Sequence, residues 1–126
     1  MTPQTSLMSS LESYVKLSSS REQLIAANMA NVDTPGYHTR DINFERELKR
    51  ATEANMTQTE FGGTTAELTP ATMEVSGLLE RPDGNNVDLD REGLMLAQTQ
   101  LQNQMGVQLI KHYFHGLMSA INGGGN

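Results

Sequence analysis

The sequence predicts a mainly α-helical protein, in which long N- and C-terminal helices pack in a coiled-coil-like arrangement and flank an irregular insert that can hold short β segments. Apolar residues recur at three- and four-residue intervals near both ends of the chain, and a Pro-Gly pair closes the first of these runs. The chain therefore divides into the first helix and its turn (1–35), the insert (36–87) and the second helix (88–126). We expect the two terminal helices to form one assembly core.

The first helix is predicted over about residues 5–32. Its main row of side chains alternates spacings of three and four residues, and a second apolar row lies beside it. A helix that is apolar over such a wide arc needs more than one neighbour. Four residues of the main row are the predicted assembly-interface residues of this helix: Leu11, Val15, Ile25 and Met29.

The end of this helix has an unusual composition. Asn28 and Asn31 lie in its last turns, where Asn is a poor helix former, but their amides can bond free carbonyls at the helix end or the backbone of the turn beyond. Pro35 cannot continue the helix, and Gly36 readily adopts positive φ. Pro35 and Gly36 therefore suit the centre of a type II turn. Small residues at 26, 27 and 30 favour close approach of another helix.

The insert shows weaker signals. Residues 44–54 favour a short helix, 62–65 a loop, 73–79 a short strand and 81–86 a turn cluster. No internal repeat is present.

The second helix is predicted over residues 88–121, at about 1.5 Å per residue on the order of 50 Å long. Asp88 is a good N-cap candidate, and Asp90 and Glu92 place negative charge in the first turn. The final turns carry the most regular apolar row of the chain, and its members are predicted interface residues: Val107, Ile110, Phe114, Leu117 and Ile121.

Composition narrows the function classes. The formal net charge of −6 argues against a nucleic-acid-binding protein, which would present a basic field. With no Trp and 5% aromatic residues, the chain has little material for a self-sufficient core. We therefore expect much apolar surface to be buried against copies or partners. The first twenty residues lack the pattern of a secretory signal, and no apolar run is long enough for a transmembrane helix, so export would need another route.

No enzyme site is predicted. His112 and His115 share a helix face, but zinc needs at least three protein ligands. The acidic residues at 83–90 do not fit a calcium loop, and no nucleophile elbow or phosphate loop is present. The sequence therefore predicts no catalytic residue, no cofactor and no metal, in a protein that is not an enzyme.

The residues around the first turn resemble the signature of the flagellar axial protein family. In that family the first helix ends in Asn-x-x-Asn followed by Thr-Pro-Gly-Tyr, and the matching residues are Asn28, Asn31, Thr34, Pro35, Gly36 and Tyr37. The segment 38–44 and a second block at 83–92 are similar to the FlgB group of rod proteins in particular. His38 stands where many members have Lys, so a fixed positive charge at that position is lost.

The resemblance implies a structural subunit of the proximal rod of the bacterial flagellar basal body. Such subunits are exported by the flagellar type III apparatus, polymerise through their terminal helices, link the inner-membrane ring complex to the distal rod and transmit torque. Implied neighbours are other FlgB copies, FliE, and the rod proteins FlgC, FlgF and FlgG. The implied location is the rod on the outer side of the inner membrane, which is periplasmic where an outer membrane exists. The alternative is a helical adaptor or export chaperone that binds a partner's amphipathic helix.

Overall fold

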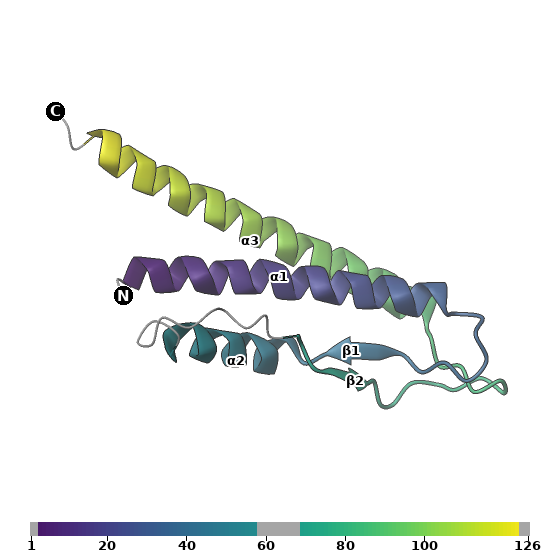
Figure 1. Cartoon of the computed structure of the whole chain (residues 1–126). Helices are drawn as coiled ribbons and strands as arrows, with labels where there is room; N and C mark the ends of the chain where they lie inside the picture. Colours follow the sequence, from purple (N-terminus) through teal and green to yellow (C-terminus); the bar gives the residue numbers. More distant parts are fainter. Residues whose placement is uncertain (1–2, 58–68, 124–126) are drawn as a thin grey trace.

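The computed structural model describes residues 3–57 and 69–123, which form three helices and a small two-stranded sheet. The order is α1 (Pro3–Ala30), β1 (Arg40–Ile42), α2 (Phe44–Thr57), β2 (Thr72–Glu74) and α3 (Leu89–Gly123). Figure 1 shows α1 in the middle, with α3 along one side and α2 and the sheet along the other. Two long terminal helices and a mostly irregular insert confirm the predicted fold class.

The middle position of α1 explains its wide apolar arc, because the helix packs on both α3 and α2. Leu17 and Ile25 are buried in it. On the α2 side, the ring of Tyr14 meets that of Phe44 edge-on, with centroids 5.3 Å apart. Two neighbours on one helix are what the two apolar rows predict.

The helices α1 and α3 approach each other closely at Gly106. A Cβ atom at this position would lie 2.8 Å from Val15 Cγ2 and 2.9 Å from Tyr14 Cδ1, so only glycine fits without rearrangement. Nearby, the Asn103 amide donates hydrogen bonds to the hydroxyls of Ser18 at 2.9 Å and Ser19 at 3.0 Å. The small residues expected to allow close approach lie elsewhere, and two of them, Ala26 and Ala30, are exposed.

In the insert, the predicted short helix is present and longer than expected, since α2 runs from Phe44 to Thr57. Asn43 caps it, because its Oδ1 accepts a hydrogen bond from Arg46 N at 3.1 Å. The strand expected over 73–79 is only partly correct: β2 covers three residues, and Gly77 beyond it has a φ of +81°. The loop expected at 62–65 lies outside the described residues.

The strands β1 and β2 pair antiparallel, with Arg40 opposite Glu74 and Ile42 opposite Thr72. Sequence reasoning did not predict β1. Its single buried side chain, Ile42, is too weak a signal for a period-two pattern.

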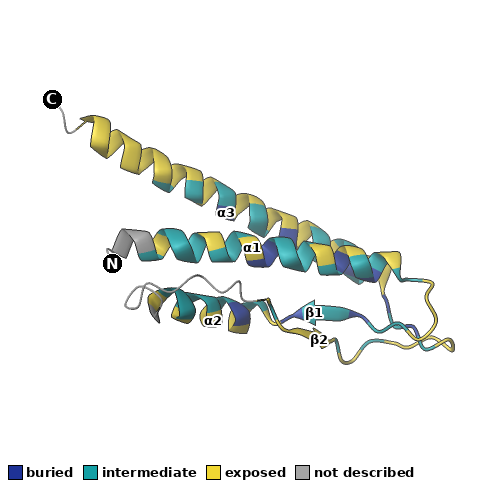
Figure 2. Cartoon of the chain, viewed as in Figure 1, coloured by how far each residue is buried: buried dark blue, intermediate teal, exposed yellow. Residues whose placement is uncertain are grey.

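Helix α3 begins as predicted, with Asp88 Oδ1 accepting hydrogen bonds from Asp90 N at 3.0 Å and Arg91 N at 3.3 Å. It runs antiparallel to α1 and diverges from it toward the C-terminus (Figure 1). Figure 2 shows the consequence: near the junction with the insert α3 has buried, half-buried and exposed residues in turn, whereas its C-terminal half is mostly exposed. Within the described residues, none of the helices combines the length and hydropathy needed to cross a bilayer.

Candidate assembly site

Among the described residues, the largest fully buried side chains are polar, and most of them gather where α1 ends and α3 begins. We call this cluster the polar junction and define it by Asn28, Tyr37, Thr39, Asn85 and Glu92. All of these except the half-buried Tyr37 are 0 to 1% exposed. Buried polar groups are costly unless their hydrogen bonds are made, so each buried side chain of the junction needs partners.

Asn28 uses all four hydrogen-bonding positions of its amide. Its Nδ2 donates to Arg40 O at 2.8 Å and to Glu92 Oε2 at 3.1 Å. Its Oδ1 accepts from Tyr37 Oη at 3.0 Å and from Arg40 N at 3.1 Å. One side chain thus connects α1, the turn, β1 and the first turn of α3, and an amide offers two donors and two acceptor positions for such a role.

The turn after α1 has the predicted form. Tyr37 N donates to Thr34 O at 3.2 Å, and Gly36 has a φ of +76°, which is the geometry of a type II turn. Asn31 stabilises the helix end, because its Nδ2 donates to Ala27 O at 2.8 Å and its Oδ1 accepts from Thr34 Oγ1 at 3.0 Å. Asn31 thus bonds a helix-end carbonyl as predicted, whereas Asn28 bonds the backbone of Arg40 in β1, which lies past the turn that the sequence indicated.

The second sequence block folds directly onto this turn. Asn85 Nδ2 donates to Asn31 O at 2.9 Å and to Thr34 O at 2.8 Å, and Gly36 N donates to Asp83 O at 2.8 Å. Gly84 has a φ of +85°, and a Cβ there would lie 3.2 Å from Gly36 Cα. The two turns therefore pack backbone against backbone, which requires glycine at the contact.

A further pair of bonds joins the block to the start of β1. Asn86 Oδ1 accepts from Thr39 N at 2.6 Å, and Asn86 N donates to Tyr37 O at 3.3 Å. Sequence reasoning identified both blocks but did not place Asn85 or Asn86 against the first turn, because nothing in their spacing indicates a contact across about fifty residues.

Ion pairs surround the junction. Arg21 on α1 binds Asp41 on β1 with both its Nε and Nη2, each at 2.9 Å. The buried Glu92 accepts from Arg91 Nη1 at 2.7 Å in addition to its bond from Asn28. A buried carboxylate with a paired cation and a second hydrogen bond avoids the penalty of an isolated charge.

His38 lies at the outer edge of the junction between two carboxylates. Its Nδ1 is 3.4 Å from Glu74 Oε2, and its Nε2 is 3.6 Å from Glu80 Oε1. The hydrogen bond to Glu74, supported by the charges of both carboxylates, raises the pKa of His38 above 6.5 despite some desolvation. Both carboxylates come from the part of the insert that returns toward α3.

The predicted interface residues separate into two groups. On α1, Ile25 is buried within the chain, and Leu11, Val15 and Met29 are half-buried. On α3, Val107 and Ile110 are half-buried, whereas Phe114, Leu117 and Ile121 are exposed. The first group therefore packs mainly within the chain, and the apolar row of α3 is left progressively uncovered as the helix diverges from α1.

Other large apolar side chains of α3 are exposed as well. They include a second row along the helix and one residue beside Phe114 on its C-terminal half: Leu94, Leu101, Met105, Leu109 and Met118. Singly exposed apolar residues are common on proteins, but a contiguous set along one helix marks an interaction surface.

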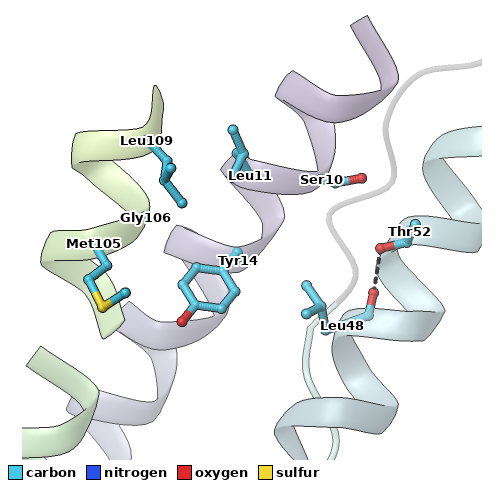
Figure 3. Close-up of a pocket in the computed structure, with 8 residues that line it drawn as sticks. All are labelled: Ser10, Leu11, Tyr14, Leu48, Thr52, Met105, Gly106 and Leu109. Atoms are coloured by element: carbon cyan, nitrogen blue, oxygen red, sulfur yellow. Dashed lines mark hydrogen bonds between the residues drawn. The ribbon is translucent and has the colours of Figure 1, made fainter. Parts of the chain in front are cut away.

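An open apolar groove of about 250 Å³ runs over α1 between α2 and α3. Figure 3 shows Ser10, Leu11 and Tyr14 of α1 between Leu48 and Thr52 on one side and Met105, Gly106 and Leu109 on the other. Both flanking helices pack on α1 but make no extensive contact with each other, so within residues 3–57 and 69–123 this stripe of α1 stays open.

Across residues 3–57 and 69–123, no three His, Cys, Asp or Glu side chains are grouped so that they could hold a metal ion. His112 and His115 lie on the exposed surface of α3.

No protein-family model matches the chain. The chain is similar to three curated flagellar basal body rod proteins FlgB. It is 36% identical to that of Salmonella typhimurium (strain LT2) over 124 residues, covering 87% of this chain and 88% of the relative. The Escherichia coli (strain K12) protein is 37% identical over 123 residues with the same coverage. The Yersinia enterocolitica protein is 32% identical over 122 residues, covering 87% and 89%.

Proposed function

Because this chain belongs to the FlgB family of flagellar basal body rod proteins, we propose that the exposed apolar row at the C-terminal end of α3 is the surface by which it joins the rod. The protein is a structural subunit of the bacterial flagellar basal body rod. The observation that carries the proposal is the uncovered row Phe114, Leu117 and Ile121. A row this regular buries apolar area only if another chain covers it.

The two terminal helices act as one assembly core in this proposal. The packing of α3 on α1 and the polar junction at their shared end support it, since together they fix the angle between the helices. The insert packs on the other side of α1 through α2, which leaves the C-terminal half of α3 free for neighbours (Figure 1).

We place the subunit in the proximal rod, on the outer side of the inner membrane, where it links the inner-membrane ring complex to the distal rod and transmits torque. Its neighbours there are further FlgB copies, FliE, and FlgC, FlgF and FlgG, and the flagellar type III apparatus exports it. Torque transmission needs a stiff subunit with contacts on several sides, and the fully bonded Asn28 and the exposed faces of α3 fit that requirement. The role needs no catalytic residue, cofactor or metal.

The test is Phe114→Ala, expressed in a strain that lacks the native gene. Phe114 is 59% exposed, so its truncation should change the stability of the free subunit little. In the rod the same ring would be buried, and truncation of a buried Phe costs about 3–5 kcal/mol. We expect the variant to be made and exported but absent from isolated basal bodies, with loss of motility.

The matched control is His112→Ala, two residues earlier and on roughly the opposite side of the helix at about 100° per residue. It should leave motility and rod incorporation intact. Normal incorporation of Phe114→Ala would contradict the proposal. Recovery of the protein in a small defined complex with one partner, in place of the rod, would favour the adaptor alternative.

A further inference from the structure

The groove over α1 is an open apolar recess among the described residues. Its floor is Leu11 and Tyr14, and its walls come from Leu48 and Thr52 on one side and Met105 and Leu109 on the other (Figure 3). An enclosed apolar cavity of about 150 Å³ accepts a benzene ring. A groove of about 250 Å³ therefore has room for an aromatic side chain and part of the helix that bears it.

The chain itself carries an aromatic side chain of the right kind on its exposed C-terminal half. Phe114 is 59% exposed, and Met118 follows it one helical turn later at 44%. Phe114 cannot enter the groove of its own chain. It lies five residues beyond Leu109, which forms the groove wall, and is therefore displaced by about 7.5 Å along α3 and rotated by roughly 140° around it.

Charge also favours a second copy. All fifteen acidic residues of the sequence lie at or before Glu92, and the only charged residue after it is Lys111, accompanied by His112 and His115. The rest of the chain carries all fifteen acidic residues and eight of the nine basic ones, so it is negatively charged as a whole. The C-terminal half of α3, which has no acidic residue, is therefore not repelled by the negatively charged remainder of another copy. Complementary charge of this kind directs one surface to another.

We propose that in the rod this groove receives the C-terminal half of α3 from a second copy of the chain, with the Phe114 ring seated between α2 and α3 above Tyr14. The inference rests on the proposed rod function and adds the partner and the mode of contact to it. The seated helix lies in a groove as an amphipathic ligand helix does, and it covers the stripe of α1 that α2 and α3 leave open.

This contact is heterologous, because the projecting helix and the groove are different surfaces of the same chain. Each copy can donate its α3 to one neighbour and accept the α3 of another. Contacts of this kind continue from copy to copy and do not stop at a dimer.

Cross-linking tests the contact, and the absence of native cysteine makes the background clean. Two variants with different tags, Met118→Cys and Thr52→Cys, would be expressed together in a strain lacking the native gene, and isolated basal bodies would be treated with a short bis-maleimide. Both substitutions keep Phe114. We expect a cross-linked product that carries both tags. The product should be lost when His112→Cys replaces Met118→Cys, because the side chain at position 112 points away from Phe114.

Filling the groove gives a second test. Ser10→Phe places a ring in the recess, and it should prevent incorporation while the circular dichroism of the purified variant stays like that of the wild type. Gln23→Phe, at an exposed position of the same helix, should be incorporated normally.

The outcomes separate the two proposals. One outcome is that both tagged variants enter basal bodies while the Met118→Cys and Thr52→Cys pair gives no more doubly tagged product than the His112→Cys control. In that case the groove contact is wrong and the rod function stands. If Ser10→Phe is incorporated normally, the contact is also wrong. If the wild-type chain itself does not enter basal bodies, the proposed function and the inference fail together.

Discussion

Asn28 is buried near the end of a helix, although a helix interior disfavours Asn, because every hydrogen-bonding group of its amide has a partner. The same holds for Asn85, whose Nδ2 reaches two carbonyls of the first turn and whose Oδ1 accepts from Val87 N at 2.8 Å. Apolar residues could fill these positions but would leave the backbone groups of the turn and of β1 unbonded. At the scale of the residue, the structure of the polar junction therefore depends on side-chain amides at these two positions.

Asn28→Asp tests this requirement at constant volume. The introduced carboxylate cannot donate to Arg40 O, and it would repel Glu92. We expect the free energy of unfolding at neutral pH to fall by about 1–3 kcal/mol or more, the cost of leaving buried polar groups unsatisfied. The loss should shrink as pH falls, because a protonated carboxyl regains one donor. Urea unfolding at several pH values measures both effects.

Asn43→Asp is the control for that substitution. The amide of Asn43 caps α2 by accepting from Arg46 N, and a carboxylate at a helix N-terminus does this as well or better. Its unfolding free energy should be unchanged or slightly raised. Equal destabilisation by the two substitutions would show that the four bonds of Asn28 have no special importance.

At the scale of the element, α1 is the helix on which both α2 and α3 pack, and its contact with α3 depends on a position that has no side chain. Gly106 lets the backbone of α3 approach Val15 and Tyr14. The helical pattern alone did not single it out, because glycine has no side chain to contribute to a periodicity. The antiparallel register is fixed on one side of this point by Asn103 with Ser18, and at the helix ends by Glu92 with Asn28.

Gly106→Ala sets two effects against each other. Alanine is favoured over glycine in a helix by about 1 kcal/mol, but contacts of 2.8 and 2.9 Å force the helices apart, and overpacking costs about 1–3 kcal/mol. We expect net destabilisation. Gly93→Ala and Gly116→Ala, where a Cβ would meet nothing within 4 Å, should instead raise the melting temperature. A melting temperature raised equally by all three would rule out a close contact at Gly106.

The pairing of β1 with β2 is short, and His38 strengthens it in a pH-dependent way. Because the pKa of His38 is raised in the folded state, its contribution to stability is complete below the unfolded value of 6.5 and is lost as pH rises through the folded pKa. NMR titration should give a pKa above 6.5 that falls most in Glu74→Gln and less in Glu80→Gln. A titration unchanged by both substitutions would show that neither carboxylate acts on the ring.

At the scale of the whole molecule, the buried polar contacts between α1, the insert and α3 gather mainly at one end. The polar junction ties α1, the insert and α3 together, and α3 then departs from α1 until its last turns are exposed (Figure 2). A helix without tertiary partners is marginal in water, since most helical stability in proteins comes from packing an apolar face. The free subunit should therefore be ordered unevenly along its length.

Amide hydrogen exchange of the purified monomer measures this gradient. We expect the slowest exchange at the junction and near Gly106, and fast exchange in the last turns of α3 and the first turns of α1. Thermal unfolding followed by circular dichroism should accordingly be only weakly cooperative. Uniformly slow exchange through both helices, in a sample shown to be monomeric, would contradict the expectation.

The sequence by itself determined the two long helices, the cap at Asp88, the turn with positive φ at Gly36 and the membership of the rod family. Each of these depends on residues close together in the chain, where periodicity, capping and turn chemistry act. Only the tertiary structure decided that Asn85 and Asn86 bind the first turn, that Gly106 sets the helix contact, and that a groove lies between α2 and α3. Such contacts join residues about fifty to ninety positions apart. A hydrogen-bonding side chain reveals through its own type that it needs a partner, but not which distant backbone group will supply one.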